Sequence, residues 1–457
     1  MSSRGGCLWH EQLPDSQASR PPLPGDTAVD VAIVGAGYTG LWTAYYLAKA
    51  DPSLRIVVLE RETAGFGASG RNGGWCSALF PASWHRMARD ATRSSVIDMQ
   101  AALEDAVDEV GRVAAAEGID CDFALGGSVA LARGLAQLHR AKAEVVEARS
   151  WGFGPDTLDL LSAGEAVRRV SATRTLGAVT TAHCAALQPA MLVTGLAKAA
   201  EALGVVIHEQ TAALEVSQRR VRTTHGTVTS DVVLTATEGY TAQLPGRRRE
   251  LAPVYSLMLA TEPLPDQVWE QIGLHDRTTF SDERHLTIYG QRTADGRIAF
   301  GGRGAPYHFG SRIDPAYERV DAVHTALQAS LIELFPVLAD ATVTHRWGGN
   351  LGVPRDWYPS VGFDRASGAA WAGGYVGDGV ATANLAGRTL ADLITGRDTA
   401  RTHLPWVRRR TARWEPEPLR WAGVNAVTAL MSRADRTEAR TGRPSRAAAG
   451  FWRALGQ

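Results

Sequence analysis

The alternation of apolar and polar residues gives the N-terminal part of the chain a distinct character. Apolar runs at 30–34 and 54–59 flank a helical segment at 41–50, and apolar residues recur at helical spacing through 92–118. Short apolar runs that alternate with helices are typical of a parallel sheet covered by helices. This part of the chain is therefore predicted to be an α/β domain.

The same character returns in the middle of the chain. Helices are expected over 161–170, where Ser162 can cap the first turn, and over 189–203. Strands are expected over 205–216 and 222–236, the second containing a turn. The segments from 189 to 236 return to the character of the first α/β region.

The pattern changes again after residue 250. Strand-like runs at 254–261, 285–289 and 297–301 follow one another before a helix is expected over 316–334. Strands without helices between them pair antiparallel, so this stretch predicts an inserted sheet. A later helix is expected to end at Ile394, and the tail that follows is expected to be helical and is rich in Trp and Arg.

The predicted fold class is α/β with an α+β insert. A chain of 457 residues is long for one core, so an α/β domain should carry an inserted antiparallel-sheet domain and a helical C-terminal tail. The expected division is an N-terminal arm (1–29), a discontinuous α/β domain (30–120, 180–250 and 344–400), an inserted domain (121–179 and 251–343) and a C-terminal extension (401–457).

Composition narrows the possible partners. The 48 basic and 48 acidic residues balance, which predicts no bulk attraction to nucleic acid or to an anionic membrane. The four cysteines lack the short spacings of a zinc site or a redox pair, and no metal is expected. There is no apolar stretch of signal-peptide or membrane-spanning type. We therefore expect a cytoplasmic protein without a membrane span or a nucleic-acid partner.

The chemical signal begins with a glycine motif. Gly35, Gly37 and Gly40 form the pattern G-x-G-x-x-G directly after a predicted strand, and Glu60 ends the next strand. The glycines allow a tight turn, close approach of a pyrophosphate and close packing of the helix on the strand, and the helix N-terminus favours the phosphates. The acid is placed to bind the adenosine ribose, and it disfavours the 2′-phosphate of NADP. Dinucleotide binding is therefore predicted, which makes the discontinuous α/β domain a Rossmann-like dinucleotide-binding domain and the inserted antiparallel-sheet domain the expected substrate domain.

Four separated patches between residues 30 and 395 carry a family resemblance. The glycine motif, Glu60, the loop Gly65–Gly74 and the loop Gly374–Val380 together resemble the amine-oxidising flavoproteins of the D-amino-acid oxidase superfamily. The resemblance is strongest to its gamma-glutamylputrescine oxidase-like subgroup. It implies that the dinucleotide is FAD.

The resemblance also implies a role for each matching residue. Glu60 would hold the ribose, and Arg61 and the backbone of Ala213 would contact the adenine. The first loop would hold the pyrophosphate through Gly35, Gly37, Tyr38, Thr39 and Gly40. The ribityl chain and the flavin ring would lie along Gly67, Ser69, Arg71, Asn72, Gly73 and Gly74. The flavin C2 carbonyl side would face Gly374, Gly377, Gly379 and Val380.

Two positions depart from the family pattern. Relatives with covalently bound FAD carry a histidine where this chain has Arg71, so FAD is expected to bind non-covalently. The late loop, Gly374–Val380, has Asp378 where the subgroup often has a neutral side chain. Because an acid would oppose negative charge on the reduced flavin, the Asp378 side chain is expected to point away from it.

The implied reaction is the oxidation of a small amine or amino acid. A hydride passes from the carbon next to nitrogen to flavin N5, and the resulting imine hydrolyses to an aldehyde or keto acid, with oxygen as the expected acceptor. The chain has no second strand–glycine motif–helix–acid unit, so electrons are expected to come from the organic substrate. The alternatives are a dehydrogenase that passes electrons to a quinone or carrier, a flavin hydroxylase, and a non-catalytic flavin-binding protein.

The candidate catalytic residues, which would contact the substrate, are Tyr289 and Arg303. Both lie on strand ends of the predicted insert, which should cover the flavin. Tyr289 is either a substrate contact or a half-buried sheet tyrosine, and Arg303 either pairs with an acidic substrate group or faces solvent. Trp75, directly after the glycine-rich loop, is a candidate for the ring's surroundings.

Overall fold

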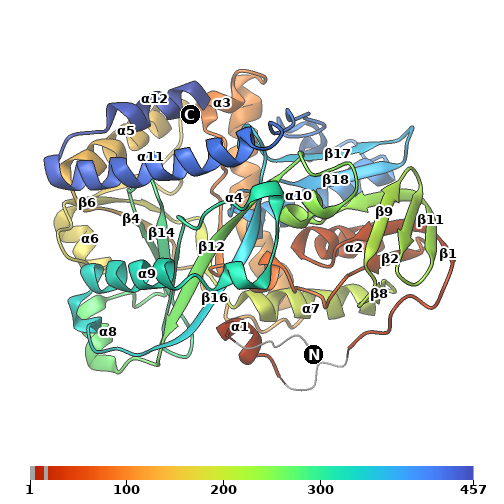
Figure 1. The fold of residues 1–457 in the computed structure, drawn as a ribbon, viewed down its shortest axis with the longest axis horizontal. Helices are drawn as coiled ribbons and strands as arrows, with labels where there is room; N and C mark the ends of the chain where they lie inside the picture. The colour runs from red at the N-terminus through yellow and green to blue at the C-terminus, as the bar shows by residue number, and fades with distance from the viewer. Residues whose placement is uncertain (1–5, 15–18, 456–457) are drawn as a thin grey trace.

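The computed structural model describes residues 6–14 and 19–455, so the predicted arm and extension are described only in part. Two eight-stranded sheets lie side by side, with a two-stranded ribbon between them (Figure 1). No described helix is both long and apolar enough to cross a membrane. The observed folding class is the α/β architecture that the apolar pattern predicts.

The first sheet contains the glycine motif. Its strands are β1 (Thr27–Val34), β2 (Ile56–Leu59), β8 (Val206–His208), β9 (Ala213–Ser217), β10 (Arg220–Thr223), β11 (Thr227–Thr235), β17 (Ser360–Asp364) and β18 (Ala369–Gly373). The order β18-β11-β1-β2-β8 is parallel throughout, and β17 adds antiparallel to β18. All four residues of β2 are buried, as expected for a strand with both faces covered.

The second sheet is mainly antiparallel. Its strands are β4 (Ser128–Ala132), β5 (Asp159–Ser162), β6 (Gly177–Thr181), β12 (Ala252–Thr261), β13 (Thr279–Asp282), β14 (Ile288–Arg292), β15 (Ile298–Gly302) and β16 (Val343–Val353). Only the β13–β4 pair among them is parallel. The predicted domain boundary at 343/344 falls at the start of β16, which is paired with β12 along its length. The division into domains stays a prediction.

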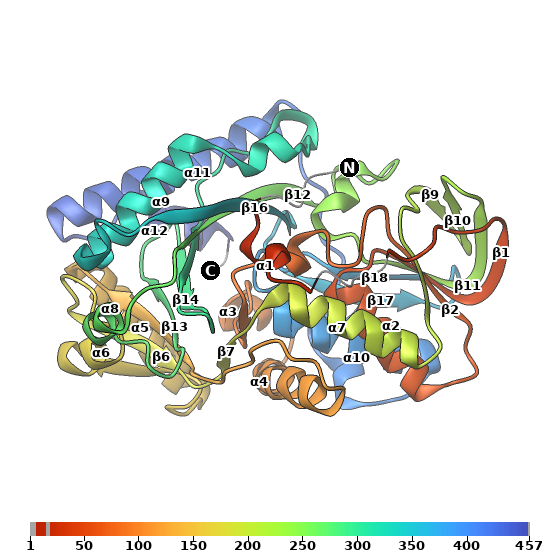
Figure 2. The same ribbon diagram turned by 90° about the horizontal axis from the view of Figure 1, so that it is seen from below.

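Helices cover both sheets and fill the space between them (Figures 1 and 2). They are α1 (Leu8–Glu11), α2 (Tyr38–Ala50), α3 (Trp84–Met87), α4 (Arg93–Ala116), α5 (Leu135–Trp151), α6 (Ala163–Arg169), α7 (Pro189–Ala202), α8 (Asp266–Ile272), α9 (Asp321–Leu334), α10 (Gly379–Thr395), α11 (Leu419–Thr441) and α12 (Arg446–Leu455). The ribbon between the sheets is formed by β3 (Trp75–Ser77) and β7 (Cys184–Ala186).

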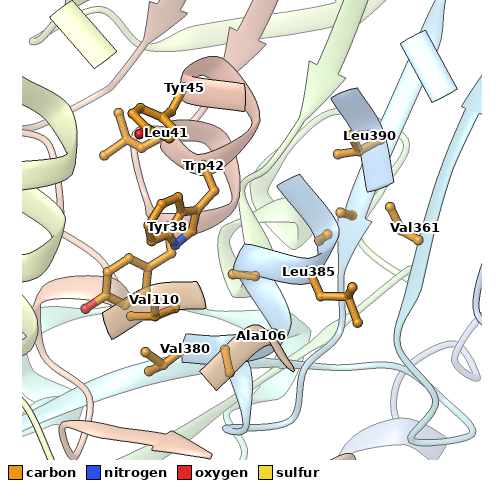
Figure 3. Packing of buried hydrophobic residues seen from close by; sticks show 14 of the residues in the cluster. Tyr38, Leu41, Trp42, Tyr45, Ala106, Val110, Val361, Val380, Leu385 and Leu390 are labelled. Atoms are coloured by element: carbon orange, nitrogen blue, oxygen red, sulfur yellow. The ribbon is translucent and has the colours of Figure 1, made fainter. Parts of the chain in front are cut away.

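The largest core lies where α2, α4 and α10 meet the first sheet (Figure 3). Trp42 and Leu385 are fully buried there, and Trp42 stacks on Tyr46 with ring centroids 5.6 Å apart. Gly387 of α10 lies directly against the Trp42 backbone, so the two helices approach closely. This core fixes the N-termini of α2 and α10 relative to one another.

Several predicted elements differ in their bounds. The predicted strand 205–216 is two strands, because the left-handed residue Gln210 and its neighbours turn the chain between β8 and β9. The predicted helix 316–334 begins at Asp321, after a 3₁₀ turn at Pro315–Glu318. The apolar pattern does not predict α5, because its buried positions are mostly small alanines.

The C-terminal tail is helical only from Leu419. Pro405, Pro416 and Pro418 interrupt the stretch before it, since proline lacks the N–H that a helix interior needs. Helix α11 is joined to the second sheet by the Asp435 carboxylate, which accepts from the backbone N–H groups of His285 and Leu286 at 2.8 and 3.0 Å. The C-terminal extension is therefore attached to the second sheet, between β13 and β14.

Candidate active site

A cavity of about 360 Å³ lies at the carboxyl ends of β1 and β2. The glycine motif, Glu60 and Arg61, the loop from Phe66 to Asn72 and the start of α10 all contribute to its wall. Ligands of open α/β sheets bind at this edge, because the strand ends and helix N-termini converge there. The cavity is therefore the first candidate for the cofactor site.

The glycine motif is shaped by contacts that a side chain would prevent. Gly35 has φ +107°, and a Cβ on it would lie 2.6 Å from the Ala236 carbonyl oxygen. Gly37 is the N-cap of α2, and a Cβ there would lie 2.9 Å from the Ser69 hydroxyl oxygen. A Cβ on Gly40 would collide with the Gly35 carbonyl. The turn therefore requires glycine for local backbone reasons that the sequence motif anticipates.

Glu60 faces the same turn. One carboxylate oxygen accepts from the Ala36 N–H at 2.9 Å and the other from the Glu62 N–H at 3.0 Å. Burial raises the pKa of Glu60, and these two N–H groups lower it again. Beside it, the Arg61 guanidinium lies 5.1 Å from the centre of the Tyr240 ring. An acid, a cation and an aromatic ring thus line one end of the cavity.

The second predicted loop packs on the first. The Ser69 hydroxyl accepts from the Tyr38 N–H at 2.9 Å, and Thr39 shares a 3.0 Å hydrogen bond with the Tyr375 hydroxyl. The Asn72 amide donates to the carbonyls of Ala68 and Ser69 and accepts from the Gly74 N–H. Loop, helix N-terminus and late loop are therefore one hydrogen-bonded unit.

The N-terminal segment, unexpectedly, completes this unit. The fully buried Trp9 donates its indole N–H to the Asn72 carbonyl at 2.9 Å, and Gln188 donates to the Trp9 carbonyl at 2.8 Å. Trp347 of β16 contacts the Trp9 ring edge-on and donates to the Arg71 carbonyl at 2.9 Å. The sequence suggests only that Trp9 anchors the arm; its hydrogen bond to the loop depends on distant segments.

Glu238 is a further residue that the sequence reasoning missed. It has φ +43° and lies in the cavity wall, where its carboxylate accepts from the N–H groups of Gly374 and Tyr375 at 2.8 and 3.1 Å. Burial raises the pKa of Glu238 to about 7 despite these contacts. The late loop is thus fixed by hydrogen bonds to the Glu238 carboxylate, which lies outside the glycine motif and outside the loops that resemble the family.

The donor set of the cavity fits a dinucleotide. Asn350 lines it and is 4 % exposed, yet neither polar atom of its amide has a hydrogen-bond partner among the described residues. A buried unpaired amide is costly unless a ligand completes it. Together with the glycine motif and Glu60, the unpaired Asn350 amide supports binding of FAD in this cavity.

The predicted cofactor residues fall into two groups. Those that line the cavity are Gly35, Gly37, Tyr38, Thr39, Glu60, Arg61, Gly67, Ser69, Asn72, Ala213, Gly377, Gly379 and Val380. Those that do not line it are Gly40, Arg71, Gly73, Gly74 and Gly374. The second group adjoins the first through packing and backbone contacts. The individual cofactor roles stay predictions.

Arg71 points to the second sheet. Its guanidinium forms a half-buried ion pair with Glu318 at 2.6 Å and lies 4.5 Å from the centre of the Phe66 ring. The Arg71 charge lowers the pKa of Glu318, which burial raises more strongly. The side chain at position 71 is therefore engaged in an ion pair with the Glu318 carboxylate.

Tyr289 reaches across the second sheet. Its ring lies over Gly301 of the neighbouring strand β15, where a Cβ would be 2.7 Å from it, and its hydroxyl shares a 2.8 Å hydrogen bond with Ser256 on β12. The same ring lies against Gly73 and meets Trp75 edge-on, with centroids 6.2 Å apart. Tyr289 thus joins the sheet to the glycine-rich loop.

Arg303 meets the late loop. One guanidinium nitrogen donates to the Val376 carbonyl at 2.7 Å and would lie 3.5 Å from a Cβ on Gly377. The Arg303 guanidinium lies 5.6 Å from the centre of the Trp357 ring. The two candidate substrate residues therefore converge on loops that also border the cavity, and Arg303 does not simply face solvent.

One cluster resembles a metal site in composition. His285, Asp435 and Glu438 bring potential ligand atoms within 4.8 Å of one another. Glu438, however, accepts from His285 at 3.0 Å and from Arg140 at 2.8 Å, and backbone N–H groups occupy both oxygens of Asp435. This cluster is accounted for by attachment of α11.

Comparison with known proteins places this geometry in a family. Residues 30–393 match the family described as FAD dependent oxidoreductase (DAO). The chain is 31 % identical over 379 residues to gamma-glutamylputrescine oxidoreductase of Escherichia coli, covering 80 % of this chain and 84 % of that one. It is 30 % identical over 407 residues to a probable oxidoreductase, OrdL, of Rhizobium meliloti, covering 86 % and 89 %.

Solved structures share the fold. Glycine oxidase from Geobacillus kaustophilus superposes with a TM-score of 0.71 at 22 % identity, covering 84 % of this chain and 99 % of that one. L-proline dehydrogenase from P. horikoshii gives a TM-score of 0.66 at 18 % identity, covering 84 % and 98 %. The chain therefore belongs to the DAO family and is an FAD-dependent oxidoreductase acting on amines or amino acids.

Proposed function

We propose that this enzyme oxidises a small amine or amino acid that carries an acidic group, giving an imine that water hydrolyses to an aldehyde or keto acid. The observation that carries the proposal is the contact of Tyr289 with Gly73 and of Arg303 with the Val376–Gly377 loop. Substrate-facing candidates thereby adjoin both loops that resemble the flavin loops of the family. Oxygen is the proposed acceptor.

The proposed cofactor residues are those that line the cavity together with their supporting loops. Bound FAD supplies a two-electron acceptor for the hydride that leaves the carbon next to nitrogen. Backbone N–H groups at the N-termini of α2 and α10 favour negative charge at the pyrophosphate and at the flavin C2 side. Because Arg71 is engaged with Glu318, we propose that FAD is held without a covalent bond.

The proposed role of Arg303 is to pair with the acidic group of the substrate. Its contact with Val376 fixes one N–H donor, and the other side of the fork remains for a carboxylate. Tyr289 is proposed to orient the substrate: burial raises the pKa of its phenol, so the hydroxyl stays protonated at neutral pH. No general base is needed, provided that the amine binds in its neutral form or loses its proton before the hydride leaves.

An anaerobic screen of amines against the purified holoenzyme tests the proposal. Loss of the oxidised flavin band with acidic amines is expected, and acid precipitation should release intact FAD into the supernatant. Colour that stays with the pellet would contradict non-covalent binding. A flavin that no amine reduces would contradict the proposed reaction, and reduction by NAD(P)H would favour a hydroxylase instead.

The acceptor is tested on the reduced enzyme. Mixing with air-saturated buffer in a stopped-flow instrument should restore the oxidised spectrum within the turnover time if oxygen is the acceptor. Slow reoxidation by air with fast reoxidation by a soluble quinone would assign the enzyme as a dehydrogenase.

A further inference from the structure

Asp378 differs from the other residues of the late loop. Its neighbours Gly377 and Gly379 line the dinucleotide cavity, whereas Asp378 does not. It is the N-cap of α10, but its side chain caps no N–H of that helix. Among the described residues, the Asp378 carboxylate has no hydrogen bond and no ion pair. The Asp378 carboxylate is therefore not engaged by the described residues, and it is free to pair with a ligand.

The charge of Asp378 acts on groups from other segments of the chain. Its charge raises the pKa of Tyr289 on β14 and of Cys184 on β7, and the charge of Arg303 lowers its own pKa. Tyr289 lies on β14, Cys184 on β7 and Arg303 directly after β15. Arg303 also donates to the Val376 carbonyl, two residues before Asp378, so the end of β15 and the loop that carries Asp378 meet at this point. That the Asp378 side chain points away from the flavin stays a prediction.

Asp378 and Arg303 form an open pair of opposite charges. They influence each other electrostatically, yet no nitrogen of Arg303 lies within 4.0 Å of an Asp378 oxygen, the limit for an ion pair, and the Val376 carbonyl holds the guanidinium. Two opposite charges kept apart in one half-buried place complement a ligand that carries both signs. An α-amino acid carries its carboxylate and its ammonium on one shared carbon.

We propose that Asp378 binds the ammonium group of the substrate while Arg303 binds its acidic group, so that the enzyme selects zwitterionic amines. This inference rests on the proposed function and adds the recognition of the nitrogen. It explains an acid in a loop where the resemblance leads one to expect a neutral side chain.

Asp378 is assigned to binding and not to proton removal. Burial raises its pKa to about 6, so it is mainly ionised at neutral pH. An alkylammonium, like that of lysine, has a pKa of about 10, so it keeps its proton against such a carboxyl group. A carboxylate beside the ammonium raises the pKa of the amine further. Asp378 therefore strengthens binding of the ammonium form, and it makes formation of the neutral amine, from which the hydride leaves, less favourable.

Two small acids that differ only in charge test this assignment on the holoenzyme. In 2-aminoisobutyrate an ammonium stands where pivalate has a methyl group, and neither has a hydrogen that could leave as hydride. Binding is followed by the change in flavin absorbance. Wild-type enzyme should prefer 2-aminoisobutyrate, and Asp378→Asn should weaken its binding about 10- to 100-fold while changing pivalate binding less than about threefold.

The matched control is Asp364→Asn, an exposed acid at the end of β17. It should leave both dissociation constants unchanged. Equal losses for the two ligands in Asp378→Asn would mean that Asp378 supports structure, and a wild-type preference below about threefold would also overturn the proposal. Neither ligand needs to be oxidised, so failure here is distinct from a flavin that no amine reduces.

A kinetic split gives a second readout. With the best substrate from the amine screen, Asp378→Asn should raise KM, and the pH at which kcat reaches half its maximum should fall. The direction follows because removal of the carboxylate lowers the pKa of the bound amine. Unchanged KM together with an unchanged kcat profile would contradict the assignment. FAD content and Tm of the variant verify that the fold is intact.

Discussion

The dinucleotide cavity and the substrate-side region are built in different ways. The cavity is formed largely by backbone: a glycine turn, helix N-termini and carboxylates that accept backbone N–H groups from Ala36, Gly374 and Tyr375. The region proposed to contact the substrate is formed by side chains from separate segments: Tyr289 on β14, Arg303 directly after β15 and Asp378 directly before α10. The first has most of its parts within short segments, and the second depends on the sheet register.

The comparison teaches that the two regions can vary separately. A backbone-built cavity keeps its shape as long as its glycines and supporting acids remain. The side-chain region can change its chemistry by single substitutions, because Tyr289, Arg303 and Asp378 come from different segments of the chain. A single cofactor site can in this way serve many amines. Variants that disturb one region and leave the other intact test this separation.

The largest effect is expected from Gly37→Val. The new side chain would meet the Ser69 hydroxyl and fill the space where the pyrophosphate is proposed to lie. FAD affinity should fall by more than about 100-fold, which corresponds to ~2.7 kcal/mol. Fluorescence titration of apoprotein with FAD measures it. Gly154→Val is the control, because no heavy atom lies within 4 Å of a Cβ there; equal affinity in both variants would mean that the motif is misread.

The second effect concerns Trp9, which couples the N-terminal segment to the cavity. Trp9→Ala removes a 1 % exposed side chain and its hydrogen bond to Asn72. Large-to-alanine changes in a core cost about 3–5 kcal/mol, so thermal or denaturant unfolding should show a large loss, and FAD affinity should fall with it. Trp421→Ala, at a 44 % exposed position, should change neither. Full FAD affinity in Trp9→Ala would remove this segment from the site.

Arg303→Ala tests whether the substrate-side region is separable. KM for an acidic amine should rise about 10- to 100-fold, since charged hydrogen bonds contribute ~1.5–3 kcal/mol. Arg303→Lys should recover little, because a point charge cannot replace the fork. FAD affinity should change less than about threefold despite the lost contact to Val376. Equal KM changes for an acidic and an uncharged amine of similar shape would assign Arg303 a structural role.

The smallest effect is a pH dependence from Glu238. Because burial raises its folded-state pKa from 4.5 to about 7, the folded protein holds a proton that the unfolded chain releases between these values. The Glu238 contribution therefore favours folding at low pH and is lost as pH rises from about 4.5 to 7, by about 1–3 kcal/mol. Denaturant unfolding of the apoprotein measures this.

Glu238→Gln is the matched variant for that experiment. It cannot ionise, so its unfolding free energy relative to wild type should improve as pH rises through this window. A difference between the two proteins that stays constant with pH would show that the carboxyl is not titrating there. FAD titration at pH 7 would additionally report how far the hydrogen bonds to Gly374 and Tyr375 matter for the cofactor.

The sequence by itself determined the dinucleotide unit and the family. Gly35, Gly37, Gly40 and Glu60 lie in one strand–helix–strand segment, whose geometry follows from local backbone rules. The same holds for the Ser162 capping box and for the long helix α4, because caps and helical periodicity are short-range properties. Strand ends near bends, such as that between β8 and β9, were less well predicted, since a single left-handed residue interrupts an apolar run.

The tertiary structure alone decided which distant residues meet. Trp9 reaches Asn72, Glu238 holds the loop at Gly374, and Tyr289 reaches Ser256 only because Gly301 leaves the intervening strand bare. None of these contacts has a signal in spacing or periodicity. They arise from strand order and register, which bring together residues far apart along the chain, and so the substrate-side chemistry is fixed at a level that local pattern does not encode.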